Sequence, residues 1–158
     1  MDKFVVLLRH GIAVPSGSEP DETRELTEEG HRRMRQIARG LKRIFPKAEA
    51  IISSPLTRAV QTATWVGKRL DLGVTTSDAL RPGSDPAAMR ALIEQTAARR
   101  IILVGHEPTL TEGMRALTGV QGEVELKKGG CYGIRIIEGS APRLEWLLPP
   151  RALRALSR

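Results

Sequence analysis

Short runs of apolar residues recur along the first two-thirds of the chain, and each run stops at polar or charged residues. The clearest runs are residues 4–8 (FVVLL), 50–53 (AIIS) and 101–104 (IILV), and a weaker one covers residues 74–76. Unbroken apolar runs of this length are typical of strands that are buried on both faces of a parallel sheet. We therefore predict a strand at each of these four places.

Apolar residues between these runs recur at intervals of three and four, which is the spacing of one helical face. The longest such segment begins at Thr27, a suitable N-cap, and continues to Phe45, where Pro46 stops it. Prolines also stand at the expected starts of the later segments, where the missing N–H is tolerated. The helices predicted in this way cover residues 27–45, 55–70, 86–97 and 108–117.

After Gly119 the pattern changes to short runs that are separated by turn residues. Residues 124–126, 132–137 and 144–148 are predicted strands, joined by turns at 127–130 and 138–140. The alternation of strands and helices before this point predicts an α/β sandwich with a mainly parallel sheet, and the later strands should extend or cap its edge. We expect one domain over residues 1–158, ending in a basic tail at 149–158 that is a short helix or a frayed end.

The composition is that of an ordinary globular protein. The chain has 158 residues, of which 41% are hydrophobic, so it can bury a full core. A single cysteine, Cys131, excludes an internal disulfide and favours a reducing, cytoplasmic setting. The first apolar run is too short for a signal peptide or a membrane span, so we expect no membrane association.

The net charge of +7 favours anionic partners, including phosphorylated molecules and nucleic acid. The basic residues are dispersed along the sequence, and aromatic residues make up only 3% of it, so stacking platforms for single strands are scarce. We therefore favour small or local anionic targets and predict no nucleic-acid partner. A nucleic-acid binder would show tight, steeply salt-dependent binding.

The three strongest predicted strands end in a similar way. The first leads into Arg9, His10 and Gly11, the second into SPLTR with Arg58, and the third into GHEP with His106. Because ligands of open α/β sheets bind beyond the carboxyl ends of parallel strands, these side chains should meet at one edge. The helix starts that follow would add backbone N–H donors at the same edge.

This set of side chains indicates phosphoryl chemistry. Two guanidinium groups offer forked donors that match phosphoryl oxygens, and two imidazoles supply a nucleophile or base and a further donor. No acidic cluster suitable for a divalent cation and no P-loop stands nearby, so we predict phosphoryl transfer through a covalent histidine without metal. Each residue alone would more simply be structural; their joint placement favours function. His31, which lies among charges in a helix's first turn, is predicted to be exposed and structural.

Five distinctive blocks of sequence follow one another along the chain. They are LLRHG at 7–11, RELTEEG at 24–30, SSPLTRAVQTA at 53–63, LRPGSDP at 80–86 and VGHEPTL at 104–110. Together they resemble the histidine phosphatase superfamily, the group that includes the phosphoglycerate mutases, and the short chain is most similar to the small bacterial phosphohistidine phosphatases of the SixA type. The resemblance implies a three-layer α/β/α fold of the phosphoglycerate mutase type. It also implies that Arg24 and the block around it mark the start of a family helix and would help to shape the rim.

The resemblance also implies roles for the residues at the predicted edge. His10 would be the nucleophile that becomes phosphorylated, and Arg9 and Arg58 would clamp the phosphoryl oxygens. His106 would complete the pocket and stabilise the group in transfer. Gly11 would allow a tight turn and leave room for the phosphate. No cofactor is implied.

One departure from the larger family members concerns the acid that protonates the leaving group. The candidate general acid is Asp85, with Asp78 less well placed, whereas Glu107 directly follows His106 and is expected to point elsewhere. Asp85 also precedes Pro86, as a helix N-cap would, and we favour this capping role slightly.

A weak acid would suit a phosphohistidine substrate, because its leaving imidazole can already carry a proton on the other ring nitrogen. An alkoxide leaving group needs a proton donor in the transition state. The sequence therefore favours a phosphatase that acts on phosphohistidine in a protein. A phosphatase of small phosphate esters with Asp85 as the acid, and a non-catalytic phosphate-binding module, stay open as alternatives.

Overall fold

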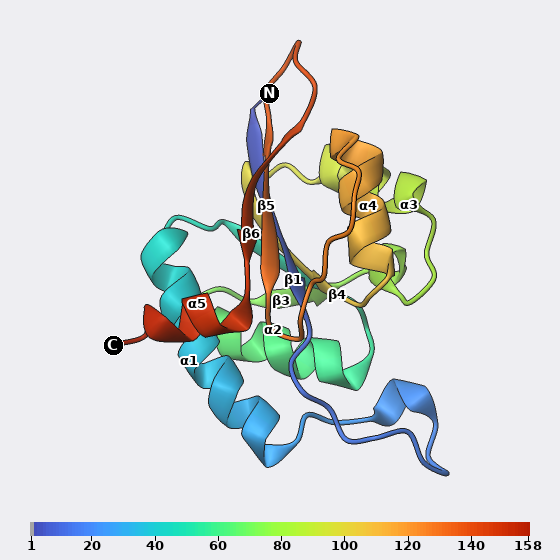
Figure 1. Ribbon diagram of the computed structural model, residues 1–158, viewed down its shortest axis with the longest axis vertical. Helices are drawn as coiled ribbons and strands as arrows, with labels where there is room; N and C mark the ends of the chain where they lie inside the picture. Colours follow the sequence, from blue (N-terminus) through green and yellow to red (C-terminus); the bar gives the residue numbers. More distant parts are fainter. Residues whose placement is uncertain (1) are drawn as a thin grey trace.

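The computed structural model describes residues 2–158, which form a central sheet between two layers of helices (Figure 1). The sheet has six strands in the order β3-β2-β4-β1-β5-β6. The first four of these are parallel to one another, whereas the last two pair in antiparallel fashion. The strands are β1 (Lys3–Arg9), β2 (Ala50–Ser53), β3 (Val74–Thr76), β4 (Arg100–Gly105), β5 (Cys131–Ile136) and β6 (Arg143–Leu148).

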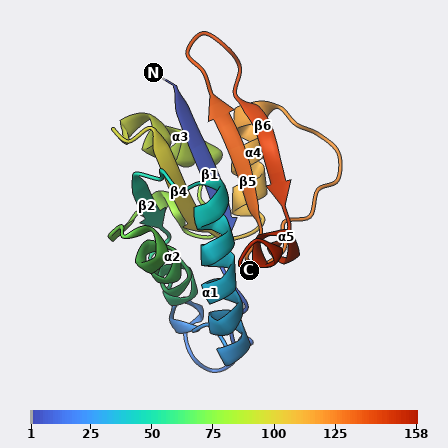
Figure 2. The same ribbon diagram turned by 90° about the vertical axis from the view of Figure 1, so that its left-hand side faces the viewer.

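The helices divide between the two faces of the sheet (Figure 2). One layer holds α1 (Glu28–Ile44), α2 (Thr57–Leu70) and the short C-terminal α5 (Pro150–Ala155), which pack together. The other layer holds α3 (Pro86–Gln95) and α4 (Thr109–Thr118). Two 3₁₀ turns, η1 (Asp21–Thr23) and η2 (Asp78–Leu80), lie in the connections. The predicted α/β/α sandwich is thus confirmed.

The apolar runs are strands because both of their faces are covered. In β1, Phe4, Val6 and Leu8 face the layer of α1 and α2, whereas Val5 and Leu7 face the layer of α3 and α4. All five side chains are buried. Successive side chains of a strand point to opposite faces, so a strand with helices on both sides must be apolar throughout.

The antiparallel end of the sheet differs from the prediction in one place. Residues 124–126 are not a strand but part of an irregular connection between α4 and β5. The apolar character of Leu126 reflects its burial in the core beside α4, and β5 already occupies the free edge of β1. Burial alone therefore produced a strand-like pattern there.

Three smaller expectations are also settled by the structure. α2 begins at Thr57 rather than at Pro55, because Leu56 takes the N-cap position in extended conformation. His31 is half-buried rather than exposed, and its Nδ1 accepts a hydrogen bond from Trp65 Nε1 at 3.0 Å. The tail holds the helix α5, whose Leu153 is fully buried.

Over residues 2–158, none of the helices is both long and apolar enough to cross a membrane.

Candidate active site

The register of the parallel strands brings the three predicted segments together. Arg9 at the end of β1 pairs with Gly105 at the end of β4, and Ser53 of β2 pairs with Val104. The next residue of each strand continues this alignment, since the His10 amide donates to the Gly105 carbonyl at 3.0 Å. Arg9, His10, Arg58 and His106 consequently meet at the carboxyl edge of the sheet, as the sequence predicts.

His10 is buried and held with one ring nitrogen free. Its Nδ1 lies 2.7 Å from the carbonyl oxygen of Gly11. Because a carbonyl oxygen can only accept, Nδ1 must carry the hydrogen, and Nε2 of the neutral ring keeps its lone pair. Burial lowers the pKa of His10 to about 3, and the charges of His106, Arg58 and Arg9 act in the same direction. The ring is therefore neutral across the neutral pH range, and the lone pair of Nε2 is available.

His106 faces His10, with the two ring centroids 5.2 Å apart. Its Nε2 lies 2.8 Å from Ser54 Oγ, which also accepts a hydrogen bond from the Leu56 amide. The serine hydroxyl has one hydrogen left to donate, which suits an unprotonated Nε2 and a hydrogen on Nδ1. Burial lowers the pKa of His106 to about 4, and the charge of Arg58 adds to this effect. His106 is therefore neutral, and in this tautomer its Nδ1 is a hydrogen-bond donor.

The two arginines are anchored from the side by backbone oxygens. Arg9 Nη1 donates to the carbonyl of Leu126 at 2.8 Å, and Arg58 Nη1 donates to the carbonyl of Asp21 at 2.9 Å. Arg58 Nη2 also donates to Asp21 Oδ2 at 3.2 Å. Burial lowers the pKa of both guanidinium groups, although arginine keeps its proton in proteins. Two fixed positive charges therefore flank the histidines.

Unpaired buried nitrogens concentrate at this place. Within residues 2–158, the buried side-chain polar atoms without a hydrogen-bond partner are Arg9 Nε, Arg58 Nε, His106 Nδ1 and Arg154 Nη1. Three of these four belong to the predicted site, although buried polar groups are normally paired. Among the described residues, no acceptor forms a hydrogen bond with these three nitrogens.

Gly11 is explained by its packing in this structure. Its amide donates to Thr62 Oγ1 at 3.0 Å, and a Cβ at this position would lie 2.8 Å from Met34 Cγ. Thr62 in turn donates to the carbonyl of Arg58 at 2.8 Å, which ties the end of β1 to the start of α2. A direct contact of Gly11 with a phosphoryl group stays a prediction.

The acidic candidates are engaged in local contacts. Asp85 is exposed and caps α3 by accepting from the Ala87 amide at 2.8 Å, which confirms the capping role. Asp78 pairs with Arg81 at 2.8 Å. Glu107 accepts from the amide of Thr111 at 2.9 Å and so points into the first turn of α4. A role of Asp85 as the general acid stays a prediction.

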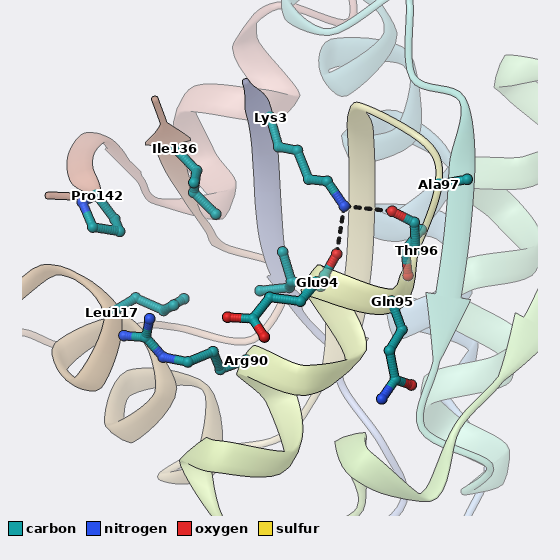
Figure 3. A pocket seen from close by; sticks show the side chains of 10 residues that line it. Lys3, Arg90, Glu94, Gln95, Thr96, Ala97, Leu117, Ile136 and Pro142 are labelled. Carbon is teal, nitrogen blue, oxygen red and sulfur yellow. Dashed lines mark hydrogen bonds between the residues drawn. The ribbon is translucent and has the colours of Figure 1, made fainter. Parts of the chain in front are cut away.

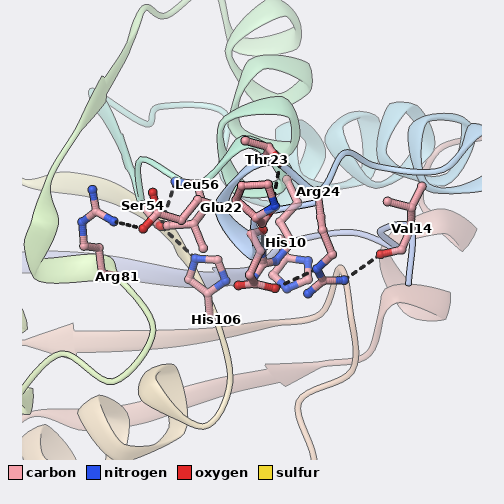
Figure 4. A network of polar contacts seen from close by, with 12 residues as sticks. His10, Val14, Glu22, Thr23, Arg24, Ser54, Leu56, Arg81 and His106 are labelled. Atoms are coloured by element: carbon pink, nitrogen blue, oxygen red, sulfur yellow. Dashed lines mark hydrogen bonds and ion pairs between the residues drawn. The ribbon is translucent and has the colours of Figure 1, made fainter. Parts of the chain in front are cut away.

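Two contributing residues were not identified by the sequence reasoning. Asp21 comes from η1 and contacts Arg58 directly. Ser54 lies beside His106 and sets the orientation of its ring (Figure 4). Ser54 lies within the block SSPLTR, so its place after a buried strand was a usable signal. Asp21 lies in a polar loop without periodicity, and nothing in the pattern points to Arg58.

A separate cavity of about 310 Å³ lies at the opposite end of the sheet, where β1 begins (Figure 3). Lys3 lies in its wall, and Lys3 Nζ donates to the carbonyls of Ile93 and Thr96 at the end of α3. It contains neither histidine nor a pair of arginines, so it does not share the chemistry of the first site. In the part of the chain that the structure describes, no three His, Cys, Asp or Glu side chains gather as metal ligands.

Comparison with known proteins identifies the class of fold. The chain superposes on the structure of the protein histidine phosphatase SixA complexed with tungstate with a TM-score of 0.83, at 24% identity, over 95% of this chain and 99% of that one. It superposes on a mycobacterial glucosyl-3-phosphoglycerate phosphatase with a TM-score of 0.76, at 18% identity, over 94% of this chain and 100% of that one. The fold is that of the phosphoglycerate mutase-like proteins.

Sequence comparison then gives the family. The family model for the histidine phosphatase superfamily (branch 1) matches residues 5–82. An uncharacterized protein from Picosynechococcus sp. is 35% identical over 135 residues, which cover 80% of this chain and 81% of that protein. The chain belongs to the histidine phosphatase superfamily.

Proposed function

We propose that this protein is a phosphatase that removes the phosphoryl group from phosphohistidine in a protein, through a phosphorylated His10. The observation that carries the proposal is the set of unpaired buried donors on Arg9, Arg58 and His106 around an unprotonated His10. A phosphoryl group offers three peripheral oxygens, so it would satisfy all three donors at once. Preorganised donors of this kind stabilise charge that develops in a transition state.

The first step transfers the phosphoryl group to His10. Nε2 of His10 attacks the phosphorus, a new N–P bond forms, and the N–P bond to the substrate imidazole breaks. The departing nitrogen takes the electron pair of that bond, and the other ring nitrogen keeps its proton, so a neutral imidazole leaves. Nδ1 of His10 continues to donate to the Gly11 carbonyl, which supports the positive charge that builds on the ring.

The second step releases phosphate. A water molecule attacks the phosphorus of phospho-His10, the N–P bond breaks, and its electron pair returns to Nε2. The water gives up one proton to the phosphate that forms or to solvent. Arg9 and Arg58 hold the phosphoryl oxygens in both steps, and no metal ion is required in this scheme.

The substrate class is inferred from the contacts of the acidic residues. Asp85 is held as a helix cap and Asp78 by Arg81, so neither is free of a structural contact. A leaving imidazole that already carries a proton does not need such an acid, whereas an alkoxide does. SixA, to which the chain is similar in fold, is described as a protein histidine phosphatase, and this supports the proposal.

The test uses purified protein with a histidine-phosphorylated protein and a panel of phosphate esters, each with and without a chelator. We expect phosphohistidine turnover that the chelator does not change. His10→Ala should lose at least about 10⁴-fold in kcat, as expected when a covalent nucleophile is removed. His31→Gln is the matched control and should keep full turnover. Unchanged turnover by His10→Ala would reject the mechanism.

Two further measurements separate the alternatives. Asp85→Asn should hardly affect phosphohistidine cleavage, but it should cripple ester hydrolysis if Asp85 were the acid of an ester phosphatase. Acid-labile phosphate trapped on His10 identifies an enzyme. Phosphate binding without such an intermediate and without turnover would instead identify a phosphate-binding module.

A further inference from the structure

The guanidinium of Arg58 has two edges, and a single residue occupies one of them. Asp21 accepts from Nη1 through its main-chain oxygen at 2.9 Å and from Nη2 through Oδ2 at 3.2 Å. Nε of Arg58 is buried and has no partner. A planar guanidinium offers its five hydrogens in fixed directions, so the contacts with Asp21 determine which edge stays available. The free edge consists of Nε and the second hydrogen of Nη2.

Asp21 is itself held in place by contacts with the surrounding loop. Arg24 Nε donates to Asp21 Oδ1 at 2.8 Å, and Arg24 Nη1 donates to the carbonyl of Val14 at 2.7 Å. The neighbouring Glu22 pairs with Arg81 at 3.2 Å. These contacts hold η1 against the start of α2. Asp21 is therefore positioned by Arg24 on one side and by Arg58 on the other.

The carboxylate of Asp21 lies at the boundary between the pocket and solvent. Its side chain is 55% exposed, whereas the side chain of Arg58 is only 5% exposed. The hydrogen bond from Arg24 and the charge of Arg58 hold the pKa of Asp21 below its usual value, so the group is ionised at neutral pH. Asp21 is therefore a fixed negative charge beside the phosphoryl clamp and not a proton donor.

We propose that Asp21 is the positioning residue for Arg58 and that its carboxylate makes the site selective for phosphoryl groups carried on an imidazole. It turns the free edge of Arg58 toward the phosphoryl group. Its charge favours a leaving group that bears a ring N–H and disfavours one that develops negative charge on oxygen. The selectivity rests on the proposed function, whereas the positioning of Arg58 does not.

Asp21→Asn tests both parts, because it keeps the shape of the side chain and removes the charge. The control is Glu29→Gln, which removes an exposed carboxylate that pairs with Arg33 on α1 and has no contact with Arg58 or Asp21. Steady-state kinetics would be measured with a histidine-phosphorylated protein and with 4-nitrophenyl phosphate, whose leaving group is an anion. Binding of orthophosphate would be measured by calorimetry, and the melting temperature would confirm that each variant is folded.

We expect Asp21→Asn to lower kcat for the phosphohistidine protein about tenfold, while KM and the Kd for orthophosphate do not rise. A merely structural loss would weaken binding and catalysis together. The ratio of kcat/KM for phosphohistidine to that for 4-nitrophenyl phosphate should fall at least about fivefold, as expected from one charge near the surface. Asp21→Glu should restore part of this ratio, and Glu29→Gln should leave it unchanged.

Two results would overturn the proposal. An unchanged ratio in Asp21→Asn would reject the selectivity, and an unchanged kcat for both substrates would reject the positioning of Arg58. If the wild-type protein cleaves 4-nitrophenyl phosphate but no phosphohistidine protein, the proposed function fails. The effect of Asp21→Asn on ester kcat and on orthophosphate binding would then still decide whether Asp21 positions Arg58.

Discussion

The protein places arginines in two contrasting regions. At the carboxyl edge of the sheet, Arg58 is buried and held by defined acceptors. On the outer surface of α1, α2 and α5, exposed cations form a second group, which we call the basic face. Its members have no ion pair with a carboxylate within the described residues, and they are Arg35, Arg39, Lys42, Arg43, Lys68, Arg69 and Arg151.

The difference lies in orientation and dielectric environment rather than in charge. A buried guanidinium with a fixed plane directs particular N–H groups at a ligand, and water screens it little. An exposed cation is screened over about 8 Å at physiological salt and samples many rotamers. Arg35 and Lys68 each lie 4.8 Å from the ring centre of Trp65, so part of the basic face serves packing. We therefore expect catalysis at the carboxyl edge of the sheet. The basic face should contribute only long-range attraction of anions.

The basic face shows how charges that are spread along the sequence come together in space. The basic residues are dispersed along the sequence, but the packing of three helices in one layer gathers many of them on one surface. Four of them line a shallow hollow of about 460 Å³, namely Arg39, Lys42, Arg43 and Arg69. Dispersion in sequence thus does not mean dispersion in space.

The largest difference between the two regions is expected when an arginine of each is replaced by lysine. Arg58→Lys removes the forked donor and its contact with Asp21, so kcat/KM should fall about 10²- to 10³-fold, the usual cost of losing a preorganised donor. Arg39→Lys, on the basic face, should leave kcat/KM unchanged. Steady-state kinetics with a histidine-phosphorylated protein measures both variants, with melting temperatures as the folding control. Similar effects at the two positions would mean that burial and orientation do not distinguish them.

A smaller effect is expected from the hydroxyl that orients His106. Ser54→Ala leaves Nε2 of His106 without its partner at 2.8 Å. Loss of one such hydrogen bond costs about 1 kcal/mol, so kcat should fall about fivefold. Ser53→Ala is the matched control, because Ser53 Oγ is equally buried but donates to the Ser54 carbonyl. A larger loss of kcat in Ser53→Ala than in Ser54→Ala would contradict the role given to Ser54.

The buried histidines should also make stability depend on pH, whereas the basic face should not. Their pKa values in the folded protein are about 3 for His10 and about 4 for His106, below the ordinary value of 6.5. The unfolded chain therefore binds more protons between pH 4 and 6.5, so stability is complete above pH 6.5 and is lost as pH falls. Each histidine should contribute about 2 kcal/mol between pH 7 and pH 5.

Denaturant titrations at pH 7 and pH 5 measure this change in the free energy of unfolding. His10→Asn should reduce the difference, because it removes one of the two groups. Arg39→Gln, on the basic face, keeps both buried histidines, so it should leave the difference unaltered. A pH dependence that is the same in His10→Asn and in the wild type would show that His10 is not held neutral by the fold.

The smallest effect is expected from reversing charges on the basic face. The double variant Arg39→Glu/Arg43→Glu should change kcat/KM less than about twofold at physiological salt, because these exposed charges are screened. Binding to duplex DNA, measured against salt concentration, should be weak for the wild type at moderate salt. Tight, steeply salt-dependent binding that the double variant abolishes would instead support a nucleic-acid partner.

The sequence predicted the parallel strands closely, because a strand covered on both faces is recorded locally as an unbroken apolar run. It also predicted that Arg9, His10, Arg58 and His106 meet, because strands of one parallel sheet end at the same edge. The strand at 124–126 was wrong for a related reason, since Leu126 is apolar through burial and not through pairing. The pattern of apolar residues indicates which side chains are buried. It does not indicate whether a segment pairs with a strand of the sheet.

By itself, the sequence determined the order of strands and helices and the chemical types at the end of each strand. These properties depend on neighbours in the chain. Only the tertiary structure decided which nitrogen of His10 is free, which edge of Arg58 is open and that Asp21 faces Arg58 across 37 positions. Hydrogen-bond partners are chosen among atoms that meet only after the chain has folded, so no local pattern can specify them.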